Sequence, residues 1–165
     1  MGSLLMRRPD LARLPSVPAE VVPAGPDDAA GLARLLDASF DETWDEGRVR
    51  RDLLDDPTGT ATLLIRDGET VIATASARSL PDRYPDAGYL HWVAADPAVR
   101  GRGLGFAVVV AVLHRFAADG FAGSVLQTDD HRLAAIRLYL RLGYVPQYPE
   151  PDHEPRWSTI LPRLL

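Results

Sequence analysis

The feature that most constrains this chain is a loop of glycines and arginines, residues 99–106, set between two apolar segments. Residues 89–95 form an apolar run typical of a buried strand, a turn follows at Asp96-Pro97, and residues 103–119 repeat apolar side chains at helical spacing. The N-terminus of a helix carries free backbone N–H groups and the positive end of the helix dipole. Glycines let an anion approach those groups, and arginines add charge-assisted hydrogen bonds. The loop therefore predicts a phosphate-bearing ligand held mainly by backbone.

Two familiar phosphate-binding loops fit this segment poorly. A dinucleotide loop has the spacing G-x-G-x-x-G directly after the first strand, whereas here Gly101-x-Gly103-x-Gly105 follows a proline turn past the middle of the chain. A P-loop requires a lysine after the glycines, but all 18 basic residues of this chain are arginines. A glycine-rich turn that only starts a helix stays open as a third interpretation.

The other patterns predict a mixed α/β domain. Asp67-Gly68 is a hairpin signal, and Gly120 and Gly143 are placed to end helices. The strands expected from pattern cover residues 20–22, 60–66, 70–78, 89–95, 124–128, 144–147 and 157–161, and the expected helices cover residues 26–40, 45–54, 103–119 and 132–142. Residues 1–19 are proline-rich and aperiodic, so we expect an N-terminal arm on the surface, followed by a single domain over residues 20–165.

Composition narrows the class of protein further. No apolar run approaches the roughly 18 residues that span a bilayer, and no signal peptide is evident, so we expect no membrane partner and a cytoplasmic location. The net charge of −5 argues against a nucleic-acid partner, and the absence of cysteine excludes disulfides and thiol nucleophiles. Met1-Gly2-Ser3 is typical of an expression remnant.

Two motifs together resemble the GNAT superfamily of N-acetyltransferases. Arg100-x-x-Gly103-x-Gly105 is similar to the acyl-CoA pyrophosphate loop of that family, and it follows a strand and a proline turn as the family's loop does. The block at residues 134–144, with an alanine, then Tyr139, then Gly143-Tyr144, resembles the family's later helix motif. The likeness extends over residues 20 to 161. The chain departs from the family in having no asparagine before the tyrosine, and Asp130 is our candidate substitute.

The resemblance implies a GNAT fold and acetyl-CoA as the cofactor. The expected fold is a mixed, mostly antiparallel sheet of six to seven strands, splayed between its two central strands and flanked by about four helices. The residues that would contact the pyrophosphate are Arg100, Gly101, Arg102, Gly103, Leu104 and Gly105. The backbone of Val93, Ala94 and Ala95 would pair with the pantetheine arm, with Asp130 and Tyr139 nearby; packing of the alanines under a helix is the alternative.

The same resemblance implies roles in acetyl transfer. Tyr139 would act as the general acid, because a phenol with a pKa near 10 is protonated at neutral pH. His91 on the central strand would act as the base, directly or through a water, with Glu42 and Asp45 as alternatives. Strand alternation places Tyr89, His91 and Val93 on one face and Leu90, Trp92 and Ala94 on the other. Both Tyr139 and His91 also fit purely structural roles.

The acceptor is expected to be a small-molecule amine, because the block before the Tyr139 helix also resembles mycothiol-synthase-like members. The residues expected to bind the acceptor are Glu42, Trp44, Tyr89 and His153, and the acidic segment at residues 41–46 could attract a cation. A non-catalytic acyl-CoA-binding sensor and a protein or peptide N-acetyltransferase are the alternatives. A homodimer is possible by analogy with relatives.

Overall fold

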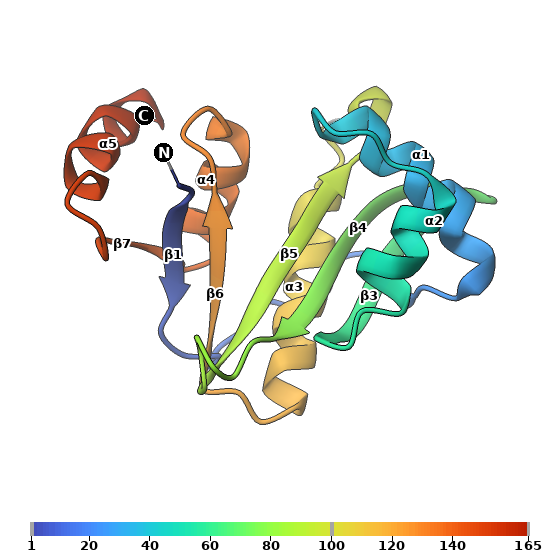
Figure 1. Cartoon of the computed structure of the whole chain (residues 1–165), viewed down its shortest axis with the longest axis horizontal. Coiled ribbons are helices and arrows are strands. Elements are labelled where there is room, and N and C mark those ends of the chain that lie inside the picture. Colours follow the sequence, from blue (N-terminus) through green and yellow to red (C-terminus); the bar gives the residue numbers. More distant parts are fainter. Residues whose placement is uncertain (1, 100, 165) are drawn as a thin grey trace.

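The computed structural model describes residues 2–99 and 101–164, which form a seven-stranded sheet in the order β2-β3-β4-β5-β6-β1-β7 (Figure 1). The pair β5–β6 is parallel and every other neighbouring pair is antiparallel. The strands are β1 Leu4–Arg8, β2 Val22–Pro23, β3 Gly59–Asp67, β4 Thr70–Ser79, β5 Ala87–Ala95, β6 Gly123–Thr128 and β7 Val145–Gln147. The mixed sheet predicted from the sequence is therefore confirmed.

Helices cover both faces of this sheet (Figure 1). They are α1 Ala29–Ser39, α2 Glu46–Val49, which continues as a π-helical turn over Arg50–Leu54, α3 Leu104–Ala118, α4 Leu133–Arg141 and α5 His153–Ile160. On one face, α1 and α2 bury a core that includes Leu32 and Leu36. The other face holds a second core to which α3, α4 and α5 contribute Val109, Ile136 and Trp157. No helix in the described ranges is long and apolar enough to cross a membrane.

The expectation of a surface arm over residues 1–19 is wrong for Leu4–Arg8. This segment is strand β1, which lies between β6 and β7 and pairs with both (Figure 1). Leu4 and Met6 point to one face and are fully buried, as the period-two geometry of a strand allows. Five residues that alternate only twice give a weak local signal, and their partners lie more than a hundred residues away in the sequence.

The strand expected over residues 157–161 is also wrong, because this segment belongs to α5 and to the 3-10 turn that follows it. Trp157 and Ile160 are buried, and Leu161 packs against the same core at a spacing that a helix places on one side. A run this short with apolar residues at both ends is ambiguous between strand and helix. The far edge of the sheet is formed by β7, which pairs with β1.

The buried position of β1 gives a test of this assignment. Met6→Ala removes a fully buried side chain, so we expect a loss of about 2–5 kcal/mol in the free energy of unfolding. Leu5→Ala is the matched control, because Leu5 is only partly buried and points to the opposite face, and its loss should be clearly smaller. Denaturant unfolding of both variants measures the difference, and equal losses would contradict the strand assignment.

Candidate active site

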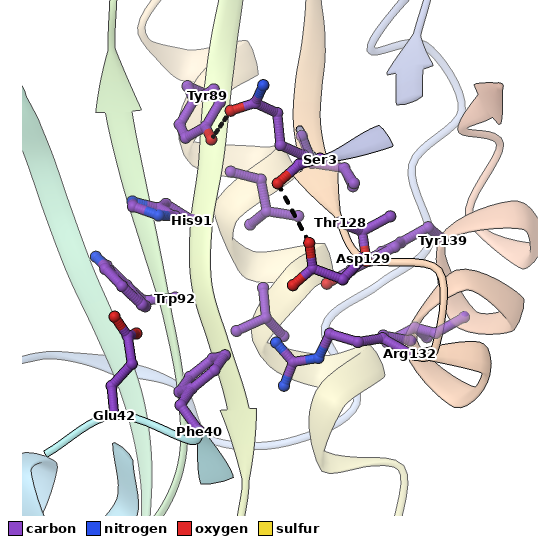
Figure 2. A pocket seen from close by; sticks show the side chains of 16 residues that line it. Ser3, Phe40, Glu42, Tyr89, His91, Trp92, Thr128, Asp129, Arg132 and Tyr139 are labelled. Atoms are coloured by element: carbon purple, nitrogen blue, oxygen red, sulfur yellow. Dashed lines mark hydrogen bonds between the residues drawn. The ribbon is translucent and has the colours of Figure 1, made fainter. Parts of the chain in front are cut away.

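The two central strands separate and leave a cleft of about 310 Å³ between them. The paired register of β5 and β6 ends at Leu90 and Leu126, and beyond this pair the cleft opens. Figure 2 shows its two facing walls: Glu42, His91 and Trp92 lie on the β5 side, whereas Asp129 and Tyr139 lie on the β6–α4 side. Tyr89 of β5 donates a hydrogen bond to Gln127 Oε1 of β6 at 3.0 Å, which bridges the two strands.

A bulge in β5 changes which side chains share a face. On β4, Ser76 pairs with His91 and Thr74 pairs with Ala94, so two residues of β5 stand opposite one of β4. Trp92 has a φ of 49°, an uncommon value for a bulky residue. The alternation predicted from the sequence is therefore wrong beyond His91. Trp92 joins the face of His91, and Val93 turns to the opposite core.

The side chain of Trp92 fixes the position of His91. The two rings stack with centroids 4.2 Å apart, and Trp92 makes edge-to-face contacts with Trp44 and Phe40, whose ring centroids lie 4.8 Å and 5.5 Å from its own. Trp44 is 5% exposed and does not line the cleft, which corrects its expected contact with the acceptor. Its role is to support Trp92 from the α1–α2 core.

The glycine loop has the backbone conformation that its sequence requires. Gly101 and Gly103 have φ values of 83° and 70°, and a Cβ added to either would meet only open space, so torsion rather than packing demands glycine. The Gly103 carbonyl accepts the first α3 hydrogen bond from Ala107, so the preceding N–H groups of the first turn have no intrahelical acceptor. Arg102 lies 3.7 Å from Asp67 in an exposed ion pair. Arg100 lies outside the described residues.

Tyr139 reaches the cleft from α4 (Figure 2). Burial raises the pKa of Tyr139 to about 12, so its hydroxyl keeps its proton at neutral pH. Within the described ranges, that hydroxyl makes no hydrogen bond to protein. The neighbouring Tyr144 differs, because its hydroxyl is bonded to Ser124 at 2.7 Å and is fully buried. Of these two tyrosines, Tyr139 is therefore the one whose proton is available to a bound molecule.

His91 lies in the cleft wall with its proton-accepting nitrogen engaged. Nη1 of Arg78 donates to His91 Nδ1 at 2.6 Å, and a guanidinium has no acceptor to offer in return. Burial, together with the charge of Arg78, lowers the pKa of His91 to about 4. The ring is therefore neutral at physiological pH. Both features argue against the expected role of His91 as general base.

Asp130 does not face the cleft. Its carboxylate pairs with Arg156 of α5 at 2.5 and 3.1 Å, and the hydrogen bond from Arg156 lowers the pKa of Asp130. The neighbouring Asp129 lines the cleft instead and accepts a hydrogen bond from Ser3. His153, another expected acceptor contact, is 4% exposed in α5 and lies outside the cleft lining. These placements correct the expectations for both residues.

Several residues that line the cleft could not be predicted as site residues from local sequence patterns, because the fold brings them together from separate segments of the chain. Arg132, just before α4, stacks its guanidinium over the ring of Phe40 at 4.4 Å, and so joins the two walls (Figure 2). Glu42 lines the cleft and lies 3.4 Å from Arg48. The lining residues that were not predicted as site residues are Ser3, Phe40, Leu90, Trp92, Leu126, Gln127, Thr128, Asp129, Arg132, Ala135 and Leu138.

Comparison with known proteins identifies the family. Residues 29–144 match the acetyltransferase (GNAT) family, and the chain belongs to this family. It is 32% identical over 153 residues to a mycothiol acetyltransferase of Nocardia farcinica, which covers 81% of this chain and 50% of that protein. A mycothiol acetyltransferase of Mycobacteroides abscessus is 32% identical over 130 residues, covering 73% of this chain and 43% of that protein. The chain spans about half the length of these relatives.

Solved structures show the same fold. A GNAT-family acetyltransferase described as putative, from Novosphingobium aromaticivorans, superposes with a TM-score of 0.68 at 25% identity, covering 89% of this chain and 61% of that one. The ribosomal-protein-S18-alanine N-acetyltransferase of Escherichia coli superposes with a TM-score of 0.66 at 19% identity, and the superposition covers 81% of this chain and 86% of that one. The GNAT fold expected from the two motifs is thereby confirmed.

The placement of Asp130 gives a test by pH. Because Arg156 lowers its pKa, Asp130 stabilises the fold above its ordinary pKa near 3.8, and this contribution is lost as pH falls through the lowered value. Asp130→Asn should reduce the melting temperature at neutral pH, and the difference from wild type should shrink below about pH 4. Asp82→Asn, in an exposed loop, is the control. A neutral-pH melting temperature equal to wild type would contradict the pairing.

Proposed function

We propose that this protein transfers the acetyl group of acetyl-CoA to an amine of a small molecule, with both substrates held together in the cleft. The observation that carries the proposal is the opening of the β5–β6 pair beside the protonated hydroxyl of Tyr139. Direct attack needs no covalent enzyme intermediate, because proximity in one site supplies much of the rate.

The residues present fit acetyl-CoA. The first turn of α3 offers N–H groups and the positive end of a 15-residue helix to a pyrophosphate, and the two positive-φ glycines leave space above them. Beyond Leu90, the backbone edge of β5 that faces the cleft has no partner in β6, so Val93, Ala94 and Ala95 are suited to pair with an extended amide chain. We assign the pyrophosphate to residues 101–105 and the pantetheine to residues 93–95.

Acetyl-CoA, when bound, supplies an acetyl group activated as a thioester. Tyr139 holds a proton at its hydroxyl oxygen and can give it to a sulfur that gains negative charge. With a pKa near 12 the phenol does not stay ionised, so it takes up a proton again in the same turnover. Tyr139 therefore begins and ends the reaction neutral.

The acceptor amine must lose a proton to become a nucleophile, and carboxylates can accept it. Glu42 and Asp129 line the cleft from opposite walls, and each can receive the proton directly or through a water (Figure 2). The same two charges attract a cationic amine before it is deprotonated. We assign the acceptor side of the cleft to Glu42, Tyr89 and Asp129.

The names of the curated relatives favour a small-molecule acceptor. Five proteins named mycothiol acetyltransferase match this chain, with identities of 28% to 42%. We therefore propose that the acceptor of this chain is a small-molecule amine. A panel of candidate acceptors would begin with the unacetylated form of mycothiol and would also contain peptides with free N-termini. A homodimer and a cytoplasmic location stay predictions.

A non-catalytic acyl-CoA-binding module is the second candidate. The observation that favours it is the engaged Nδ1 of His91, which leaves the cleft without a histidine base. Release of coenzyme A that depends on an added amine supports the enzyme. Tight binding of acetyl-CoA without turnover on the full panel supports the binding module.

The glycine loop gives the first test. Isothermal titration with acetyl-CoA should show binding in the micromolar range, and NAD⁺, as the control ligand, should not bind. Gly103→Ala places a Cβ where the phosphate would approach, so we expect at least about tenfold weaker binding. Gly68→Ala is the matched control, because Gly68 also has a positive φ and open surroundings but lies in the β3–β4 turn. Equal affinity in both variants would contradict the assigned site.

The hydroxyl of Tyr139 gives the second test. Tyr139→Phe keeps the ring and removes the proton, so kcat should fall by about tenfold or more while the Kd for acetyl-CoA changes little. Tyr148→Phe is the control, since Tyr148 is 55% exposed and remote from the cleft lining. Thiol release with the best acceptor of the panel is the measurement. An unchanged kcat would remove Tyr139 from the mechanism.

A further inference from the structure

Arg78 of β4 is the centre of a hydrogen-bonded group behind the cleft wall. Its Nη1 donates to His91 Nδ1 at 2.6 Å, and its Nε donates to Thr58 Oγ1 at 2.9 Å. Its Nε also lies 3.3 Å from Asp56 Oδ2. Asp56 Oδ1 in turn accepts from the backbone N–H and the hydroxyl of Thr58, both at 2.8 Å. The guanidinium is thus held in one orientation by groups on two sides.

This arrangement determines which nitrogen of His91 carries the proton. Arg78 can only donate, so Nδ1 must present its lone pair, and in a neutral ring the proton then lies on Nε2. Nε2 has no hydrogen-bond partner within residues 2–99 and 101–164, and it is not among the buried polar atoms without partners. Nε2 is therefore accessible from the hollows that lie beside the ring.

The ring itself is fixed in the wall between two hollows. It lines the cleft on one side and a smaller hollow of about 230 Å³ on the other. Trp92 stacks on the ring at 4.2 Å, and Tyr89 meets it edge-on at 5.3 Å. With Arg78 held on Nδ1, these two neighbours leave the ring little freedom to rotate.

Burial, together with the charge of Arg78, keeps the ring of His91 neutral. Arg78 and Asp56 act on it most directly, with opposite signs, and the charged residues that line the hollows beside it are Glu42, Arg51, Asp52, Asp129 and Arg132. Burial and Arg78 lower the pKa of His91 and outweigh Asp56, which raises it. At neutral pH the ring has no tendency to accept a proton.

We propose that Arg78 is a positioning residue that holds His91 as the neutral Nε2–H tautomer, so that the wall of the cleft presents a hydrogen-bond donor and not a base. The role of this donor in acetyl transfer rests on the proposed function. Its partner is an oxygen of the acceptor substrate, a hydroxyl or carbonyl that lies next to the reacting amine. An acceptor with such an oxygen is bound better than a simple alkylamine.

The tautomer can be measured without any substrate. Long-range ¹H–¹⁵N correlation spectra of the imidazole rings, assigned by the loss of one set of signals in His91→Gln, report the protonated nitrogen. We expect Nε2 to be protonated, Nδ1 to be unprotonated, and neither signal to titrate between about pH 5 and 8. A protonated Nδ1, or titration near the ordinary pKa of about 6.5, would overturn the proposal.

The role of Arg78 is tested by its removal. In Arg78→Met, with Asp56 still present, the pKa of His91 should rise by about one unit or more and both tautomers should be observed. Arg83→Met is the matched control: Arg83 lies over Tyr84 in the following loop, and its removal should leave the His91 signals unchanged. If Arg78→Met does not fold, the wild-type spectrum alone decides the tautomer. A folded Arg78→Met protein with wild-type His91 signals would contradict the role of Arg78.

Activity then separates a donor from a base. Gln supplies an amide N–H near the position of Nε2 but cannot act as a base, so His91→Gln should keep at least about tenfold more kcat/KM than His91→Ala on an oxygen-bearing acceptor. Equally large losses in both variants would overturn the donor role. Failure of the proposed function would be recognised separately, since no amine of the panel would then stimulate release of coenzyme A, while the His91 spectra would be unaffected.

Discussion

The separation of the parallel pair β5–β6 is the constraint on which the rest of the site depends. Four residue pairs, from Ala87–Gly123 to Leu90–Leu126, join these strands before they part. Because the pairing stops there, backbone groups of β5 are left facing a cleft, and α4 can bring Tyr139 to its far wall. The bulge at Trp92 lies just past the last pair, and it turns two consecutive side chains, His91 and Trp92, toward one face.

The orientation or protonation of several side chains in the cleft is determined by neighbouring residues that do not line the cleft. Arg78 determines the protonated nitrogen of His91, Trp44 supports Trp92, and Arg156 binds Asp130 so that the adjacent Asp129 faces the opening. Each of these three supporting residues lies on a different segment from the residue that it contacts. The chemistry of the cleft is thus governed by tertiary contacts more than by local sequence.

The sequence predicts the glycine loop, the central strand and the Tyr139 helix because each has a strong local signal. These signals are closely spaced glycines, an apolar run and helical periodicity, respectively. It does not predict β1, because five residues carry little pattern and their partners are distant. It misplaces the last element because 157–161 fits a strand or a helix. The bulge is equally invisible, since Trp92 adopts a conformation that no propensity favours. The roles assigned to His91 and Asp130 changed because their arginine partners, Arg78 and Arg156, are not adjacent in the chain.

The position of β1 has a consequence for how the domain folds. Leu4 pairs with Thr128, and Arg7 pairs with both Val125 and Val145, so β1 lies between two strands that follow it by more than a hundred residues in the sequence. Contacts of such long sequence separation form late and slow the folding of a domain. Ser3 and Asp129, which meet at the wall of the cleft, are 126 residues apart in the sequence. The helices and the β3–β5 meander can form earlier, and the cleft is among the last parts of the molecule to be completed.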